Sequence, residues 1–167
     1  MYIMKKIFFL LLMTICVVIN AQTIPTLPCK AKKIPIGTKV VFKLVPTDSA
    51  IYDISILSEE PFETIIDMFN HDSLFTDIRI DSVLVCYFCI GTYGDTEEER
   101  NQNMNTVLLI KNKSSYNLSY DSEIRTVEYG DFEKTSNVGC FAGATTMEQW
   151  PYMIYTIGIS NFRKLKN

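Results

Sequence analysis

The sequence predicts an all-β, mainly antiparallel protein, and three observations lead to that prediction. Apolar and polar residues alternate with a period of two in several short segments. Clusters of Pro, Asn, Asp, Ser and Gly separate these segments at short intervals, as turn residues do. No stretch repeats at a fixed length. Together these features are typical of a β-sandwich.

Residues 1–21 have the pattern of a secretory signal peptide. Lys5 and Lys6 form a positive start, residues 7–19 are apolar, and Asn20 and Ala21 form a small-residue exit. The apolar run of 13 residues is shorter than the roughly 20 that cross a bilayer as a helix, so no permanent membrane anchor is expected. The exit NAQT resembles signal ends that are common in secreted proteins of the Bacteroidota. We therefore expect cleavage after Ala21 and a secreted or periplasmic protein, of bacterial origin.

The chain that remains after residue 21 is long enough for one domain with its own core. We expect an extended lead-in over residues 22–37 and a single β-sandwich domain over residues 38–167. Because the leader carries two lysines and no acid, its removal changes the formal net charge from −3 to −5. A mildly acidic protein without a Lys/Arg cluster is not expected to bind nucleic acid or an anionic membrane surface.

The first half of the domain predicts two strands and one helix. Residues 38–45 and 50–57 alternate between apolar and polar side chains, and residues 46–49 form a turn between them. In residues 58–70, Phe62, Ile65, Ile66 and Phe69 have the spacing of one helix face, and two glutamates fall where the first turn would be. This segment is the one short helix that the sequence predicts.

The second half predicts further strands. Residues 78–90 begin half exposed and become continuously apolar, as a buried central strand would, and residues 91–105 are polar and predict a long loop. Residues 106–110 and 118–124 alternate around a polar turn and predict a β-hairpin, and residues 153–159 predict the last strand. About seven strands and one short helix suggest an immunoglobulin-like β-sandwich. The Cys, Trp, Cys order of antibody domains is absent, because Trp150 follows every cysteine.

Four cysteines remain in the mature chain: Cys29, Cys86, Cys89 and Cys140. In an extended strand the Cα atoms of Cys86 and Cys89 are about 10 Å apart and their side chains point to opposite faces, so these two do not bond to each other. An oxidising compartment then leaves two connectivities, in which Cys29 pairs with one of them and Cys140 with the other. The alternative is one bridge and two buried thiols. A redox pair would require a helix that starts at its first cysteine, and the sequence predicts none there. A zinc site would require a second close pair of ligands, which the sequence also lacks.

No established catalytic motif is present. The sequence contains neither a G-x-S-x-G nor an H-E-x-x-H motif, and its only histidine, His71, is expected in an exposed turn. Carboxylates such as Asp81, Glu123, Asp131 and Glu148 are plentiful, and no pair is singled out. We therefore expect no metal and no cofactor.

The segment 138–152 is the best candidate for a binding surface. It is predicted to be a long irregular loop, and Phe141, Trp150 and Tyr152 would offer rings for a sugar or a protein contact. In the competing interpretation Trp150 plugs one end of the sandwich. The sequence thus favours a non-enzymatic binding protein with an unknown protein or glycan partner. The alternatives are a small cell-envelope enzyme, performing hydrolysis or thiol-disulfide chemistry, and an inhibitor or immunity-type protein for a cationic enzyme.

Overall fold

The computed structural model describes residues 26–76 and 82–165, so the signal peptide and its cleavage site lie outside the described residues. The strands are β1 (Ala31–Pro35), β2 (Thr38–Pro46), β3 (Ile51–Pro61), β4 (Ile66–Asp67), β5 (Val83–Thr92), β6 (Asn105–Asn112), β7 (Leu118–Arg125), β8 (Glu133–Thr135), β9 (Thr145–Trp150) and β10 (Thr156–Lys164). A short 3₁₀ helix, η1, covers Asp72–Phe75, and the α-helix α2 covers Glu97–Gln102.

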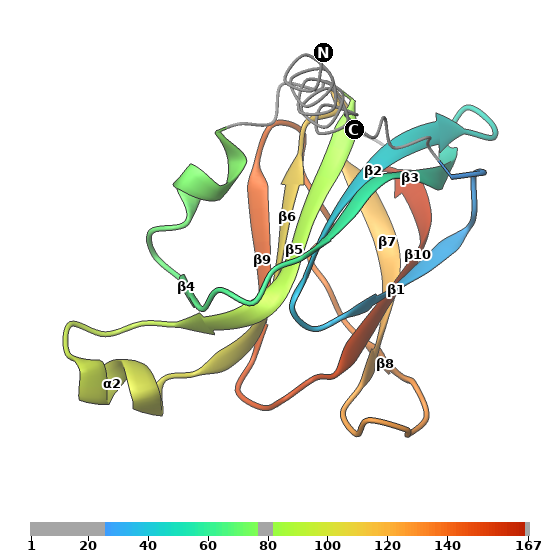
Figure 1. The fold of residues 1–167 in the computed structure, drawn as a ribbon. Helices are drawn as coiled ribbons and strands as arrows, with labels where there is room; N and C mark the ends of the chain where they lie inside the picture. The colour runs from blue at the N-terminus through green and yellow to red at the C-terminus, as the bar shows by residue number, and fades with distance from the viewer. Residues whose placement is uncertain (1–25, 77–81, 166–167) are drawn as a thin grey trace, which may run out of the picture.

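The strands form a single hydrogen-bonded sheet that curls into a half-barrel (Figure 1). Its order is β8-β7-β10-β3-β2-β5-β6-β9, with β1 paired to β10 and β4 paired to β5. All pairs are antiparallel except β4 with β5. The prediction of an all-β, mainly antiparallel protein with one short helix is confirmed. The finer expectation of seven strands in two layers is not met, because ten strands are joined in one curled sheet.

The segment between β8 and β9 joins two parts of the barrel. The backbones of Leu118 and Cys140 exchange two hydrogen bonds of 2.9 Å, at the start of β7. At the end of β6, Asn112 N donates to Ala144 O and Asn112 O accepts from Gly143 N, at 3.0 and 2.9 Å. This segment therefore lies between the end of β6 and the start of β7. The predicted hairpin of these two strands is wrong for that reason, although both strands exist.

Two apolar clusters stabilise the sheet from its two faces. The inner cluster fills the curl and includes Phe42, Phe88 and Phe162. The outer cluster covers the other face of β2, β5 and β6, where Ile66, Met68 and Phe75 from residues 62–75 pack over it. Strand β5 is buried on both faces, which confirms the predicted central strand over residues 83–90, whereas its expected half-exposed start over residues 78–81 lies outside the described residues.

The one α-helix in residues 26–76 and 82–165 is not where the sequence pattern suggested. Residues 58–61 continue β3, because Ser58, Glu59 and Glu60 pair with β2, and residues beyond Pro61 run on extended into β4. Ile66 and Met68 are buried while Ile65 and Phe69 are exposed, which is the alternation of an extended chain and not a helical stripe. The helix is α2, inside the predicted loop 91–105. Thr96 caps it through a reciprocal capping box with Glu99.

The cysteines are free thiols in the described residues, so the predicted disulfides are not formed. Cys86 and Cys140 belong to the inner cluster, and Cys29 packs against it. Cys89 points the other way, into the outer cluster, which contains no second described cysteine. The prediction that Cys86 and Cys89 face opposite sides is confirmed. Both predicted connectivities pair Cys89 with either Cys29 or Cys140. Because Cys89 lies on the opposite face of the sheet, it is separated from both of these cysteines.

Candidate functional site

A cleft of about 910 Å³ lies over β7 and β10, and β1 and the segment that follows β8 form its sides. Most of its lining side chains carry a hydroxyl, an amide, a carboxylate or an ammonium group. Those side chains are Lys32, Lys33, Ser119, Asp121, Ser122, Glu123, Lys134, Thr135, Ser136, Asn137, Ser160 and Asn161.

Strand alternation places the polar groups in the cleft. Along β7, Leu118, Tyr120 and Ile124 are buried in the inner cluster, so Ser119, Asp121 and Glu123 face outward. Asp121 pairs with Ser160, and Glu123 pairs with Gly158, in the β7–β10 ladder. Gly158 is buried beneath the Glu123 side chain, since a Cβ there would lie 2.8 Å from Glu123 Cγ. The missing side chain lets Glu123 lie close to the sheet.

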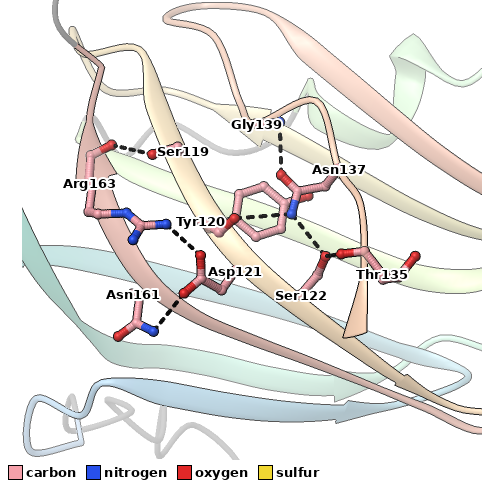
Figure 2. Close-up of polar contacts among 9 residues, drawn as sticks. All are labelled: Ser119, Tyr120, Asp121, Ser122, Thr135, Asn137, Gly139, Asn161 and Arg163. Atoms are coloured by element: carbon pink, nitrogen blue, oxygen red, sulfur yellow. Dashed lines mark hydrogen bonds and ion pairs between the residues drawn. The ribbon is translucent and has the colours of Figure 1, made fainter. Parts of the chain in front are cut away.

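A β-bulge in β10 fixes the carboxylate of Asp121 (Figure 2). The register shifts by one residue between Ser160 and Arg163, and Asn161 takes a left-handed conformation with φ 54°. Asn161 Nδ2 donates to Asp121 Oδ2 at 2.8 Å, and Arg163 Nη2 donates to Oδ1 at 2.5 Å. These hydrogen bonds, that of Asn161 first, hold the pKa of Asp121 below its usual value. Asp121 is therefore a fixed anion at neutral pH.

The opposite wall is fixed by Asn137 (Figure 2). Its Nδ2 donates to Tyr120 O at 3.0 Å and to Ser122 Oγ at 2.8 Å, and its Oδ1 accepts from Gly139 N at 3.0 Å. Gly139 has φ 78°, and a Cβ there would lie 2.6 Å from Leu118 O, so only glycine fits. The wall is held in place before any ligand arrives, which lowers the entropic cost of binding.

The cleft also contains charges that are free to contact a ligand. Glu123 and Lys134 face each other across the β7–β8 ladder, yet within residues 26–76 and 82–165 neither side chain forms a hydrogen bond or ion pair, although the charge of Lys134 helps to lower the pKa of Asp121. Lys32 is paired instead with Glu59, at 2.6 Å. The site thus offers hydroxyls, amides and one uncommitted carboxylate, which can exchange hydrogen bonds with a polar ligand.

The aromatic residues proposed from sequence do not form one site. Trp150 is only 8% exposed and belongs to the inner cluster. Phe141 and Tyr152 are 44% and 50% exposed, but they flank β9 at its two ends. Residues 145–150, expected to be irregular, are a strand paired with β6. His71 is placed apart from the cleft, where its Nδ1 lies 3.0 Å from Met68 O.

The sequence held only part of the signal for the cleft. The alternation of Ser119, Asp121 and Glu123 against buried neighbours was visible, because those residues share one strand. Gly158, Asn161 and Asn137 come from distant segments, and their place beside β7 depends on strand order. Nothing in their local pattern sets them apart.

Comparisons with known protein families, with characterised proteins and with solved structures find no match to this chain. The described residues hold no group of three or more His, Cys, Asp or Glu side chains arranged to bind a metal ion. In the same part of the chain, no helix is long and apolar enough to span a membrane.

Proposed function

We propose that this protein is an exported, non-enzymatic binding protein whose cleft over β7 and β10 takes a neutral, hydroxyl-rich ligand, a glycan. The observation that carries the proposal is the cleft itself, in which amides, hydroxyls and carboxylates converge from β7, β10 and the segment after β8. Such groups exchange hydrogen bonds with sugar hydroxyls in both directions. Export rests on the leader pattern of residues 1–21.

One observation favours a hydrolase as a second candidate. Asp121 and Glu123 are two residues apart on one face of β7, so two carboxylates share the cleft, as glycoside hydrolysis requires. The binding function is preferred because Asn161 and Arg163 each donate to one oxygen of the Asp121 carboxylate, so both oxygens are engaged in holding the bulge and not in activating a water or attacking a sugar.

The test is a glycan array followed by titration of the selected oligosaccharide. Gly158→Val should displace Glu123 into the cleft and weaken binding at least about tenfold, equivalent to about 1.4 kcal/mol. Gln149→Val is the matched control, because Gln149 is an exposed residue of β9 that does not line the cleft. Thermal unfolding checks that both variants fold.

Three outcomes would contradict the proposal. They are an array without a selected glycan, an unchanged affinity of Gly158→Val, and binding of extended peptides in place of sugars. Release of a shortened sugar on incubation with the protein would establish the hydrolase instead, and Glu123→Gln would then abolish that release.

A further inference from the structure

We propose that one end of the barrel docks a basic protein partner, independently of the ligand in the cleft. The surface consists of five large apolar side chains that are exposed to solvent: Val127, Tyr129, Tyr152, Met153 and Tyr155. We refer to these five residues as the aromatic end. They come from two connections, residues 126–132 between β7 and β8 and residues 151–155 between β9 and β10.

Backbone hydrogen bonds hold the two connections side by side at the same end of the barrel (Figure 1). Tyr155 N donates to Arg125 O at 2.9 Å, directly before the first connection begins, and Tyr155 O accepts from Ile36 N at 2.9 Å. In the second connection, Ile154 is fully buried and Trp150 nearly so, and both belong to the inner cluster. These two side chains anchor the loop, so the three apolar residues around Ile154 are turned outward.

Tyr129 is the most prominent member of the surface. It is 89% exposed and stands in a tight turn in which Gly130 N donates to Val127 O at 3.2 Å. A Cβ at Gly130 would lie 2.2 Å from Val127 Cγ2, so the glycine lets the Val127 side chain pack against this turn. A tyrosine on a constrained turn loses little entropy on binding, and exposed apolar groups gathered in this way mark interaction sites.

The charge around the aromatic end selects the partner. Glu128, Asp131 and Glu133 are exposed, and none of them forms an ion pair within the described residues. Two cations beside the first connection lie over the Phe132 ring: Lys33 Nζ is 4.3 Å and Arg125 Cζ 5.3 Å from its centre. Carboxylates beside apolar rings complement a basic surface with an apolar pocket. They repel anionic lipid and a second copy of this acidic chain.

The experiment uses an array of short Lys/Arg-rich peptides that each contain one Leu, Phe or Trp. Their matched controls are the same peptides with every Lys and Arg replaced by Glu. Wild-type protein should bind basic peptides and not their acidic counterparts. Tyr129→Ala should weaken the binding at least tenfold. The double variant Glu128→Gln/Asp131→Asn should also weaken it, and the loss of affinity should be larger at low salt than at high salt.

Two variants serve as controls for location. Phe141→Ala removes an exposed ring at the opposite end of β9 and should leave the affinity unchanged. Gly158→Val alters the cleft and should also leave it unchanged, which separates this proposal from the glycan site. Because Tyr129 is almost fully exposed, Tyr129→Ala should unfold at the wild-type temperature.

The proposal is overturned if basic and acidic peptides bind alike, if none of the basic peptides binds, or if Phe141→Ala weakens binding as much as Tyr129→Ala. Sedimentation that shows a dimer lost in Tyr129→Ala would assign the surface to a second copy. Binding to phosphatidylglycerol vesicles that is lost in the same variant would assign it to a membrane.

Discussion

At the scale of single residues, two buried tyrosines provide a matched test of hydrogen bonding. Tyr120 stacks on Phe162 with ring centroids 5.5 Å apart, and its hydroxyl has no partner among the described residues. Tyr87 donates its hydroxyl to Leu74 O at 2.8 Å. Removing an unsatisfied hydroxyl relieves a desolvation cost, whereas removing a bonded one loses an interaction.

We therefore expect Tyr120→Phe to raise the free energy of unfolding by about 1 kcal/mol and Tyr87→Phe to lower it by about 1 kcal/mol. Urea denaturation of both variants and the wild type, with equal m-values, measures the difference. A destabilised Tyr120→Phe would show that this hydroxyl is satisfied.

The cysteines differ in reactivity for a physical reason that also belongs to the residue scale. Burial raises the pKa of Cys89 and of Cys140 to about 12, and it raises the pKa of Cys86 well above its usual value, with a smaller contribution from Cys140. Only the thiolate reacts with alkylating agents, and Cys29 is the only described cysteine that is not buried.

Iodoacetamide at pH 8, followed by peptide mapping, should label Cys29 in the native protein and all four described cysteines after unfolding. Rapid native labelling of Cys86, Cys89 or Cys140 would contradict this burial. If two cysteines stay unlabelled in the unfolded, unreduced protein, those two form a disulfide.

At the scale of elements, local pattern predicted a segment well when the strand partners were close along the chain. Strands β2 and β3 pair through a turn in which Asp48 Oδ1 accepts from Ala50 N and Ile51 N, at 2.7 and 2.8 Å. An Asp at that position favours such a turn, so the turn could be predicted from the sequence. The continuous apolar run of β5 likewise predicted burial on both faces.

The helix was misplaced because its apparent stripe arises by coincidence. Phe62 and Ile66 contact the outer cluster, but Ile65 and Phe69 are exposed, so four apolar residues at helical spacing do not share one face. Long-range pairing with β2 decides the conformation of residues 58–61. The true helix lacks any buried residue, so it has no apolar stripe, and its only local mark was Thr96 three residues before Glu99.

At the scale of the whole molecule, sheet order was beyond local pattern. Strand β10 pairs with β1, β3 and β7, three elements that are far apart in the sequence. The cleft depends on the β7–β10 contact, because it brings Gly158 beside Glu123 and Asn161 beside Asp121. Side-chain alternation gives a strand's faces but not its neighbours, so the half-barrel and its site emerged only with the structure.

A fully buried amide, that of Asn112, joins three segments at one end of the half-barrel. Its Nδ2 donates to Tyr116 O at 2.8 Å and to Cys140 O at 3.1 Å, and its Oδ1 accepts from Ser114 N at 2.9 Å and from Ser114 Oγ at 2.7 Å. This side chain ties the end of β6 to the residues before β7 and to the segment after β8. Its loss leaves several buried polar groups without partners.

We expect Asn112→Ala to lower the free energy of unfolding by about 3 kcal/mol, measured by urea denaturation. Asn105→Ala, at the other end of β6, removes one hydrogen bond to Asn103 O and should cost about 0.5 to 1 kcal/mol. Amide exchange should also rise at Leu118 and Cys140 in Asn112→Ala, because their mutual backbone bonds lie at the same junction. Equal losses in the two variants would mean that the curled sheet is held by its apolar clusters alone, and that the segment between β8 and β9 is a passive connection.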